Sequence, residues 1–215
     1  MARIQVRLGG YGPEMVAAVR DAATRTGTDD PEVHAMLASV YEKRSMPKEA
    51  LAEINAAIKL DPQANYYFIA AKLLMGQKEY TEAERMLDLA IAANPNRSHF
   101  FIAKGEVRMT LGDDPGALKM FEKAESLNPE DHDAYLDQGI ALDSMKEYGR
   151  AVEKIRQAVR LRPDIPELRY FLAVAYIDNS QSALAETELR KALELKPGYR
   201  EALDLLKNMP AARPR

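Results

Sequence analysis

The residues best suited to chemistry stand together in the run EDHD, from Glu130 to Asp133. Carboxylate and imidazole groups of this kind can hold a divalent metal ion. The run directly follows Pro129, at the expected start of a helix, where acids complement the positive end of the helix dipole and an Asp can cap it. A calcium site gathers more oxygen ligands, and a zinc site usually adds a further His or a Cys. We therefore interpret EDHD as a helix start and predict no metal site.

Other signatures of catalytic sites are missing from the sequence. The chain contains no G-x-x-x-x-G-K, no G-x-S-x-G and no H-E-x-x-H. The run GGYGP at residues 9–13 lacks the glycine order that cradles a phosphate, and LGDDPGA at residues 111–117 lacks the alternating ligands of a calcium loop. We interpret the first as a flexible leader and the second as a turn between helices. We predict that the chain is not an enzyme and needs no cofactor.

The composition limits the partners and the compartment. The 30 Lys and Arg residues against 33 Asp and Glu give a net charge of -3, which argues against a nucleic-acid partner. No apolar run approaches the roughly 18 residues of a membrane span, so we expect no direct membrane insertion. We expect a cytoplasmic protein as the sequence stands, and a periplasmic or membrane-anchored one if a leader was trimmed. The absence of cysteine fits either compartment.

Proline recurs along the chain with a nearly constant period. The spacings are 33, 34, 34 and 34 residues between Pro62, Pro95, Pro129, Pro163 and Pro197. Alanine stands twelve and five residues before each of these prolines, and a large apolar residue stands eight before it. Small residues let two helix backbones approach while large ones fill the gaps, and each proline ends the helix before it. The pattern predicts repeated pairs of packed helices.

These residues resemble the tetratricopeptide repeat (TPR) family, whose unit is a pair of antiparallel helices. The first-helix signature of that family is present too, for example at Leu37, Ala38 and Tyr41. The tryptophan often seen near the start of the first helix is replaced in every unit, by His34, Tyr67, Phe101, Tyr135 and Arg169. The resemblance implies an all-α fold, a right-handed superhelical α-solenoid of five TPR helix-turn-helix units with terminal cap helices.

The resemblance also divides the chain into segments. We expect five repeats stacked as one domain, at residues 31–63, 64–97, 98–131, 132–165 and 166–199. Before them we expect a flexible leader at residues 1–12 and an N-terminal helix at 13–30, a partial repeat or cap with Met15, Val19 and Ala22 or Ala23 on one stripe. After them we expect a C-terminal cap helix at 200–209 and a disordered tail at 210–215. Self-association through the terminal segments is the alternative to capping.

In this family the concave surface is lined mainly by the first helix of each unit. The matching positions of this chain form a candidate groove with an apolar centre and acidic edges. Its predicted partner-binding residues are Phe68, Lys72, Met75, Ile102, Glu106, Met109, Leu136, Ile140, Asp143, Tyr170, Val174 and Ile177. The alternative for each of these side chains is a place in the core between helices. Because only Asn65 and Lys72 could clamp a carboxylate, we do not expect binding of the acidic chaperone tails that some members hold.

The sequence thus predicts a non-catalytic scaffold or adaptor for a protein partner. The partner would place an apolar, basic-flanked peptide or helix in the concave groove, in the assembly of a bacterial multiprotein complex. The alternative is a regulatory or chaperone TPR module excised from a larger protein. The sequence does not identify the partner itself.

Overall fold

The computed structural model describes residues 14, 16–17, 19–21 and 30–209. Within these ranges every regular element is a helix and no strand is present. Contacts divide the chain into two compact units, Met1–Pro95 and Asn96–Arg215, and each is described by itself. Continuity of the expected stack across residues 95 and 96 stays a prediction. The leader at residues 1–12 and the tail at 210–215 lie outside the described residues.

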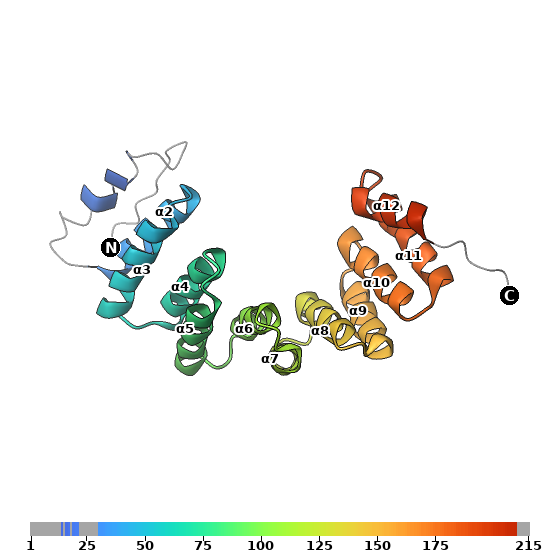
Figure 1. The fold of residues 1–215 in the computed structure, drawn as a ribbon. Coiled ribbons are helices and arrows are strands. Elements are labelled where there is room, and N and C mark those ends of the chain that lie inside the picture. Colours follow the sequence, from blue (N-terminus) through green and yellow to red (C-terminus); the bar gives the residue numbers. More distant parts are fainter. Residues whose placement is uncertain (1–13, 15, 18, 22–29, 210–215) are drawn as a thin grey trace. The chain divides into compact units, whose positions relative to one another are not determined.

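The helices come in pairs of constant length, a first helix of 13 residues and a second of 14 (Figure 1). The first or A helices are α2 (Pro31–Lys43), α4 (Ala64–Gly76), α6 (Ser98–Thr110), α8 (His132–Ser144) and α10 (Pro166–Asp178). The second or B helices are α3 (Pro47–Leu60), α5 (Tyr80–Ala93), α7 (Asp114–Leu127), α9 (Tyr148–Leu161) and α11 (Ser182–Leu195). The helix α12 (Arg200–Asn208) follows the last pair.

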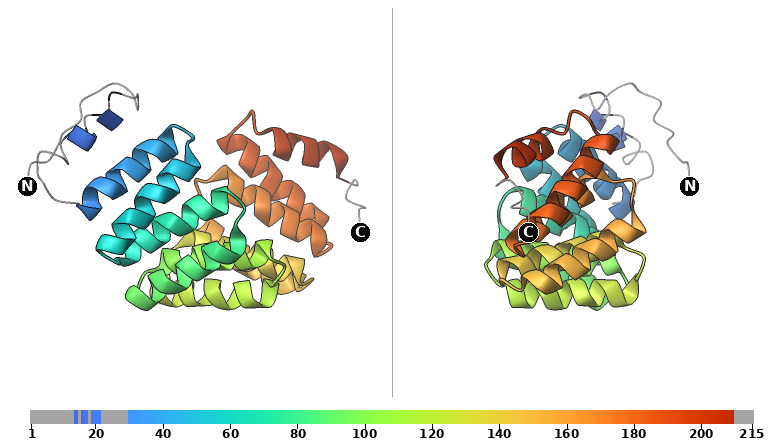
Figure 2. Two further views of the ribbon diagram at one scale, coloured as in Figure 1. Left: turned by 60° about the vertical axis from the view of Figure 1, so that its left-hand side comes forward. Right: turned by 90° about the vertical axis from the view of Figure 1, so that its right-hand side faces the viewer.

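Within each unit, every A helix packs against the B helix that follows it, and every B helix packs against the next A helix (Figure 2). The first unit contains α2 to α5, and the second contains α6 to α12. This is the predicted all-α solenoid class of packed helical pairs. Since α2, α4, α6, α8 and α10 begin at residues 31, 64, 98, 132 and 166, we propose the same repeat boundaries as the sequence predicts.

The recurring alanines form the contact between helices, as predicted. All of them are fully buried, at 0% exposure: Ala50, Ala57, Ala83, Ala90, Ala117, Ala124, Ala151, Ala158, Ala185 and Ala192. The recurring prolines follow the last turn of each B helix, because the residue before each proline is the C-cap, beginning with Asp61 and Asn94. The N–H of each C-cap residue donates to the carbonyl of the alanine five residues before the proline. Proline cannot extend that ladder of hydrogen bonds, so the helix ends there.

The turn between the A and B helices of each pair contains one residue in the left-handed region. Its φ angle lies between 57° and 64° at Ser45, Lys78, Lys146 and Ser180, and is 83° at Gly112. The turn geometry is therefore shared by all five repeats, although glycine, which adopts it without strain, stands in only one.

We expect Lys146→Gly to stabilise the chain by roughly 1 kcal/mol, because glycine removes the steric cost of the left-handed conformation. Gly112→Ala should destabilise it by a similar amount, since an added Cβ meets no atom within 4 Å but imposes that cost. Thermal unfolding followed by circular dichroism measures both. Two shifts of the same sign would contradict the role of the turn conformation.

The fourth residue of each A helix and the seventh residue of its B helix form a second set of equivalent positions. The pairs in chain order are His34 with Glu53, Tyr67 with Met86, Phe101 with Met120, Tyr135 with Lys154, and Arg169 with Glu188. In the first and last repeats the pair is polar, with His34 Nδ1 2.7 Å from Glu53 and Arg169 Nη1 2.9 Å from Glu188. In the fourth repeat the Lys154 ammonium lies over the Tyr135 ring, 5.4 Å from its centroid. At the position where the family often has tryptophan, this chain thus uses polar pairs in the first and last repeats and a cation–π contact in the fourth.

We expect Glu188→Ala to destabilise the chain by about 1 to 3 kcal/mol, because it leaves the half-buried Arg169 guanidinium without its carboxylate. The double variant Arg169→Phe with Glu188→Met copies the pair of the third repeat and should recover most of that loss. Urea unfolding of the single and double variants makes the comparison. A double variant as unstable as Glu188→Ala would show that the two repeats are not interchangeable at this position.

Both ends of the repeat array are covered by helical residues. Near the N-terminus, Val19 is 1% exposed, and Arg20 donates to the Tyr41 hydroxyl and to Glu53. Met15, Ala22 and Ala23 of the predicted stripe lie outside the described residues. At the other end, Ala202 of α12 is fully buried, and Leu205, Leu206 and Met209 pack against the core of α8 to α11. Within the described residues, no helix is long and apolar enough to cross a membrane.

Candidate functional site

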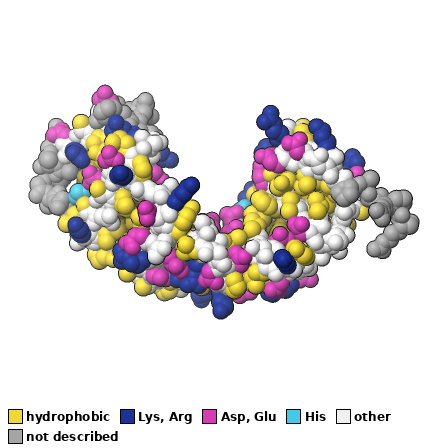
Figure 3. All heavy atoms as spheres, viewed as in Figure 1, with side chains coloured by type: hydrophobic (Ala, Val, Ile, Leu, Met, Phe, Trp, Pro, Cys, Tyr) yellow, Lys and Arg dark blue, Asp and Glu magenta, His cyan; other side chains and the backbone are white. Residues whose placement is uncertain are grey.

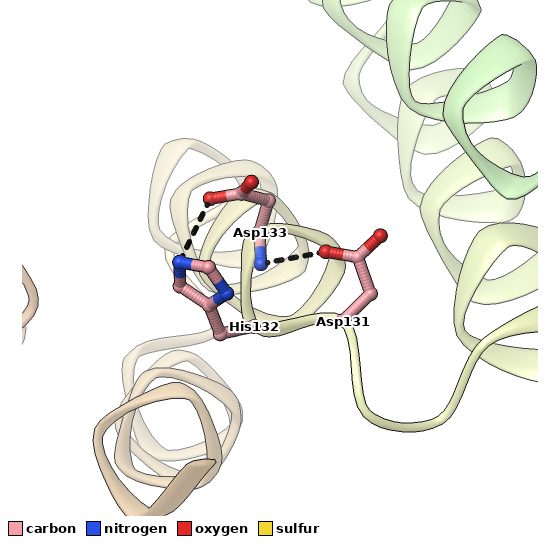
Figure 4. Close-up of side chains that lie close together, drawn as sticks. All are labelled: Asp131, His132 and Asp133. Atoms are coloured by element: carbon pink, nitrogen blue, oxygen red, sulfur yellow. Dashed lines mark hydrogen bonds and ion pairs between the residues drawn. The ribbon is translucent and has the colours of Figure 1, made fainter. Parts of the chain in front are cut away.

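The EDHD run forms the start of α8 (Figure 4). The Asp131 carboxylate accepts a hydrogen bond from the backbone N–H of Asp133 at 3.2 Å and so caps the helix, as predicted for an Asp in this run. His132 Nε2 lies 3.5 Å from a carboxylate oxygen of Asp133. One ligand atom from each of these residues lies within 4.8 Å of the others, but the residues are consecutive and exposed or half-buried. Their contacts are those of a helix N-terminus, and we base no metal site on them.

Three A helices of the second unit present one continuous face. Within this unit α8 contacts both α6 and α10. We call the surface formed by their side chains that are not buried against B helices the A-helix face. Nine predicted partner-binding residues lie on these helices: Ile102, Glu106 and Met109 on α6, Leu136, Ile140 and Asp143 on α8, and Tyr170, Val174 and Ile177 on α10. The other three, Phe68, Lys72 and Met75, lie on α4 of the first unit.

The predicted partner-binding residues differ in burial from the packing residues. All twelve are exposed or half-buried, whereas the large packing residues Ile54, Leu87, Phe121 and Leu189 are at 0% exposure. Partial burial does not by itself decide between core and partner contact. Ile102 and Met109 pack against the core cluster formed by residues of α7, α8 and α9. Leu136, Tyr170 and Ile177 pack against the core cluster of α8 to α11.

Ile140 and Val174 stand apart from the other apolar residues of the A-helix face. Both are half-buried, and neither is among the side chains that pack against the two core clusters described for this unit. They lie on the neighbouring helices α8 and α10. Figure 3 shows hydrophobic side chains gathered over the second unit, with acidic side chains among them. Apolar side chains that the fold covers only in part are suited to contact with a partner.

An aromatic group borders the A-helix face at α10. The Tyr170 ring packs against Phe171 and Tyr199, with centroid distances of 5.6 and 5.5 Å. Burial and the nearby Glu167 raise the pKa of Tyr199 to about 12, so its hydroxyl stays protonated at neutral pH. The Lys196 ammonium lies 4.6 Å from the Tyr199 ring centroid and pairs with Glu167 at 2.8 Å. These contacts fix the position of Tyr170.

Two acids of the face were not predicted from the sequence, Asp137 on α8 and Asp178 at the end of α10. Burial and the charges of Glu106, Asp133 and Asp131 raise the pKa of Asp137 from 3.8 to about 7. The sequence does carry a signal for Asp137. The equivalent residues of the other repeats are apolar, namely Met36, Ile69, Ala103 and Phe171, so an acid at this position is unexpected from packing alone.

The sequence matches one known family along most of its length. Residues 35–98, 68–132 and 136–200 match the family described as Tetratricopeptide repeat. A curated relative, the anaphase-promoting complex subunit 3 of Schizosaccharomyces pombe, is 24% identical over 171 residues. The match covers 78% of this chain and 26% of the relative, so this chain spans about a quarter of the relative's length.

Solved structures share the same fold. The YrrB structure, described as that of a TPR protein with an unusual peptide-binding site, is 23% identical with a TM-score of 0.69, covering 89% of this chain and 99% of that one. The structure of MamA from Desulfovibrio magneticus RS-1, from residue 41 to its end, is 20% identical with a TM-score of 0.73, covering 80% of this chain and 98% of that one. At these identities the likeness concerns the fold alone.

Proposed function

Because the chain belongs to the tetratricopeptide repeat family, we propose that it is a non-catalytic scaffold or adaptor that binds a segment of a protein partner on its A-helix face. Repeats of this family are generally interaction modules without catalytic activity. The segment is an apolar peptide or helix with basic flanks, and the complex that it helps to assemble is a bacterial multiprotein complex. No nucleic acid takes part, in keeping with the net charge of -3.

The observation that carries this proposal is the partial exposure of Ile140 and Val174, which are half-buried on neighbouring A helices and lie outside the described core clusters. A partner segment that covers both would remove apolar surface from water. The acids beside them favour basic residues in the partner. The names of similar proteins support the same reading, since one relative is a subunit of a complex and one solved structure is described as having a peptide-binding site.

We expect the double variant Ile140→Glu with Val174→Glu to lose its partner in a pull-down from native lysate, while its helical circular dichroism stays that of the wild type. The matched control is Leu184→Glu with Leu195→Glu, which changes two apolar residues of the B helix α11 that are each 46% exposed. The control should keep the partner. Loss of the same protein by both variants, or by neither, would overturn the assignment of the A-helix face.

The second candidate function is a regulatory or chaperone module of a larger protein. It is favoured by the length of the curated relatives, of which the matched region makes up between 17% and 36%. An immunoblot of the source cells with an antibody against this chain tests it. A single band at the mass of this chain, 24.0 kDa, would argue against a larger protein.

A further inference from the structure

Four acids gather where α6 meets α8 on the A-helix face. Glu106 comes from α6, and Asp131, Asp133 and Asp137 come from the start and middle of α8. Asp137 is half-buried, and the charges that act on its carboxyl are those of the other three acids. Among the described residues, no hydrogen-bond donor or cation pairs with Asp137. The free chain thus holds a partly desolvated carboxyl among like charges.

A second pair of acids lies where α8 meets α10. Asp143 and Asp178 stand near the C-terminal ends of these two helices. One carboxyl oxygen of Asp143, Oδ1, is buried, and the described residues offer it no hydrogen-bond partner. Burial and the charge of Asp178 raise the pKa of the Asp143 carboxyl. This second acid site therefore shares its character with the first, and α8 separates the two.

The apolar residues Ile140 and Val174 lie on the same face as both acid sites. A partly desolvated carboxylate without a cation beside it raises the free energy of the folded chain. A cationic side chain of a partner would lower that free energy again. Lysine and arginine carry apolar stems that pack on aliphatic side chains while the charged end reaches a carboxylate. Such residues match both the charges and the apolar contacts of this face.

We propose that the partner segment inserts two cationic side chains, lysine or arginine, one at Asp137 between α6 and α8 and one at Asp143 and Asp178 between α8 and α10. The residues between these two cations cover Ile140. This inference rests on the proposed function and adds the number and places of the partner's basic residues. In the proposed function those residues only flank an apolar segment, whereas here they bind within the face.

The positions of the acids give an approximate spacing for the two cations. Asp137 and Asp143 are six residues apart on α8, which is about 9 Å along the helix axis. The two helix boundaries are separated by about one interhelix distance, roughly 9 Å. The combined separation of about 13 Å corresponds to about four residues of an extended segment. The expected partner motif is therefore two basic residues about four positions apart, with apolar residues between them.

The test uses a library of random dodecapeptides displayed on phage and selected on the full chain at about pH 8, where Asp137 is ionised. We expect the selected peptides to carry the motif. Asp137→Asn and Asp143→Asn should each weaken binding of a selected peptide by at least about tenfold, because they remove one partner of a partly buried charge pair. The matched control is Glu122→Gln, which neutralises an exposed acid of the B helix α7 and should leave the affinity unchanged.

The pH dependence gives a readout that a merely structural role would not move. The affinity of the wild-type chain should fall as the pH is lowered from about 8 to about 6, because protonation of Asp137 competes with the cation. The Asp137→Asn variant should lack this dependence.

The outcomes separate this inference from the proposed function. Peptides that need Ile140 and Val174 for binding but lack basic residues, or that bind Asp137→Asn as well as the wild type, overturn the inference and leave the proposed function standing. Selected peptides whose binding is unaffected by Ile140→Glu with Val174→Glu overturn the proposed function and this inference with it. A selection that yields no binding peptide overturns both.

Discussion

The Asp137→Asn variant is expected to be more stable than the wild-type chain at about pH 8 and not more stable at about pH 4. Burial and three neighbouring acids raise the pKa of Asp137 from 3.8 to about 7 in the folded chain. Between about pH 4 and about pH 7, Asp137 of the folded chain holds a proton that the same residue of the unfolded chain has released. The contribution of Asp137 to the stability of the wild type therefore falls as the pH rises from about 4 to about 7, and stays lower above that range.

The expected gain of the variant at about pH 8 is roughly 2 to 4 kcal/mol. The rise of the Asp137 pKa from 3.8 to about 7 corresponds to about 4 kcal/mol, and the partial exposure of Asp137 to water lowers this value. Thermal unfolding followed by circular dichroism between about pH 4 and about pH 8 measures it. Glu122→Gln removes an acid outside the cluster and should keep the pH profile of the wild type. An unchanged profile in Asp137→Asn would show that another group titrates in this range.

The two expectations for Asp137→Asn have opposite signs, and this makes the variant informative. Replacing an acid that serves the fold lowers the stability of the chain. Replacing an acid that serves binding raises the stability of the chain and lowers its affinity for the partner. Asp137 interrupts a position that is apolar in the other four repeats. A variant that is both more stable and a weaker binder would indicate that this interruption serves the partner.

The helices and their packing could be predicted from the sequence because the same contacts recur in every repeat. Proline ends each B helix, alanine stands at each helix crossing, and a large residue fills each gap. Because this pattern recurs in all five repeats, it indicates the same packing geometry in each. The family resemblance then assigned helix order and candidate face residues. The left-handed turn residue was missed because serine, lysine and glycine share the position, and only glycine signals it in a sequence.

The candidate site was less predictable, because it depends on which side chains from neighbouring helices meet. Periodicity places Leu136 and Ile140 on one face of α8, but only the structure shows that Leu136 packs against a described core cluster and that Ile140 lies outside the clusters described for this unit. The periodicity of the sequence also does not reveal that Glu106 of α6 lies near Asp137, or that Asp178 of α10 lies near Asp143. The assignment of the twelve predicted residues to partner binding stays a prediction that the face variants test.

The Gly105→Ala variant is expected to destabilise the chain by roughly 2 kcal/mol, despite the higher helix propensity of alanine. A Cβ built at Gly105 would lie 2.3 Å from the ring of Phe121, which is fully buried. The equivalent pairs of the second and fifth repeats combine alanine with leucine: Ala71 with Leu87, and Ala173 with Leu189. In the third repeat, glycine thus stands opposite phenylalanine, the largest of the five facing residues.

A double-mutant cycle measures this size compensation directly. Phe121→Leu alone should cost about 1 kcal/mol for the smaller buried side chain, while Gly105→Ala with Phe121→Leu recreates the pair of the other repeats and should be more stable than Gly105→Ala alone. Gly139→Ala is a second test of the same close approach, because a Cβ there would lie 2.2 Å from the Ile155 side chain and 3.3 Å from the Ala151 carbonyl oxygen. Gly139→Ala is therefore expected to destabilise the chain as well. Additive effects at residues 105 and 121 would mean that the repeat adjusts its backbone instead of matching side-chain sizes.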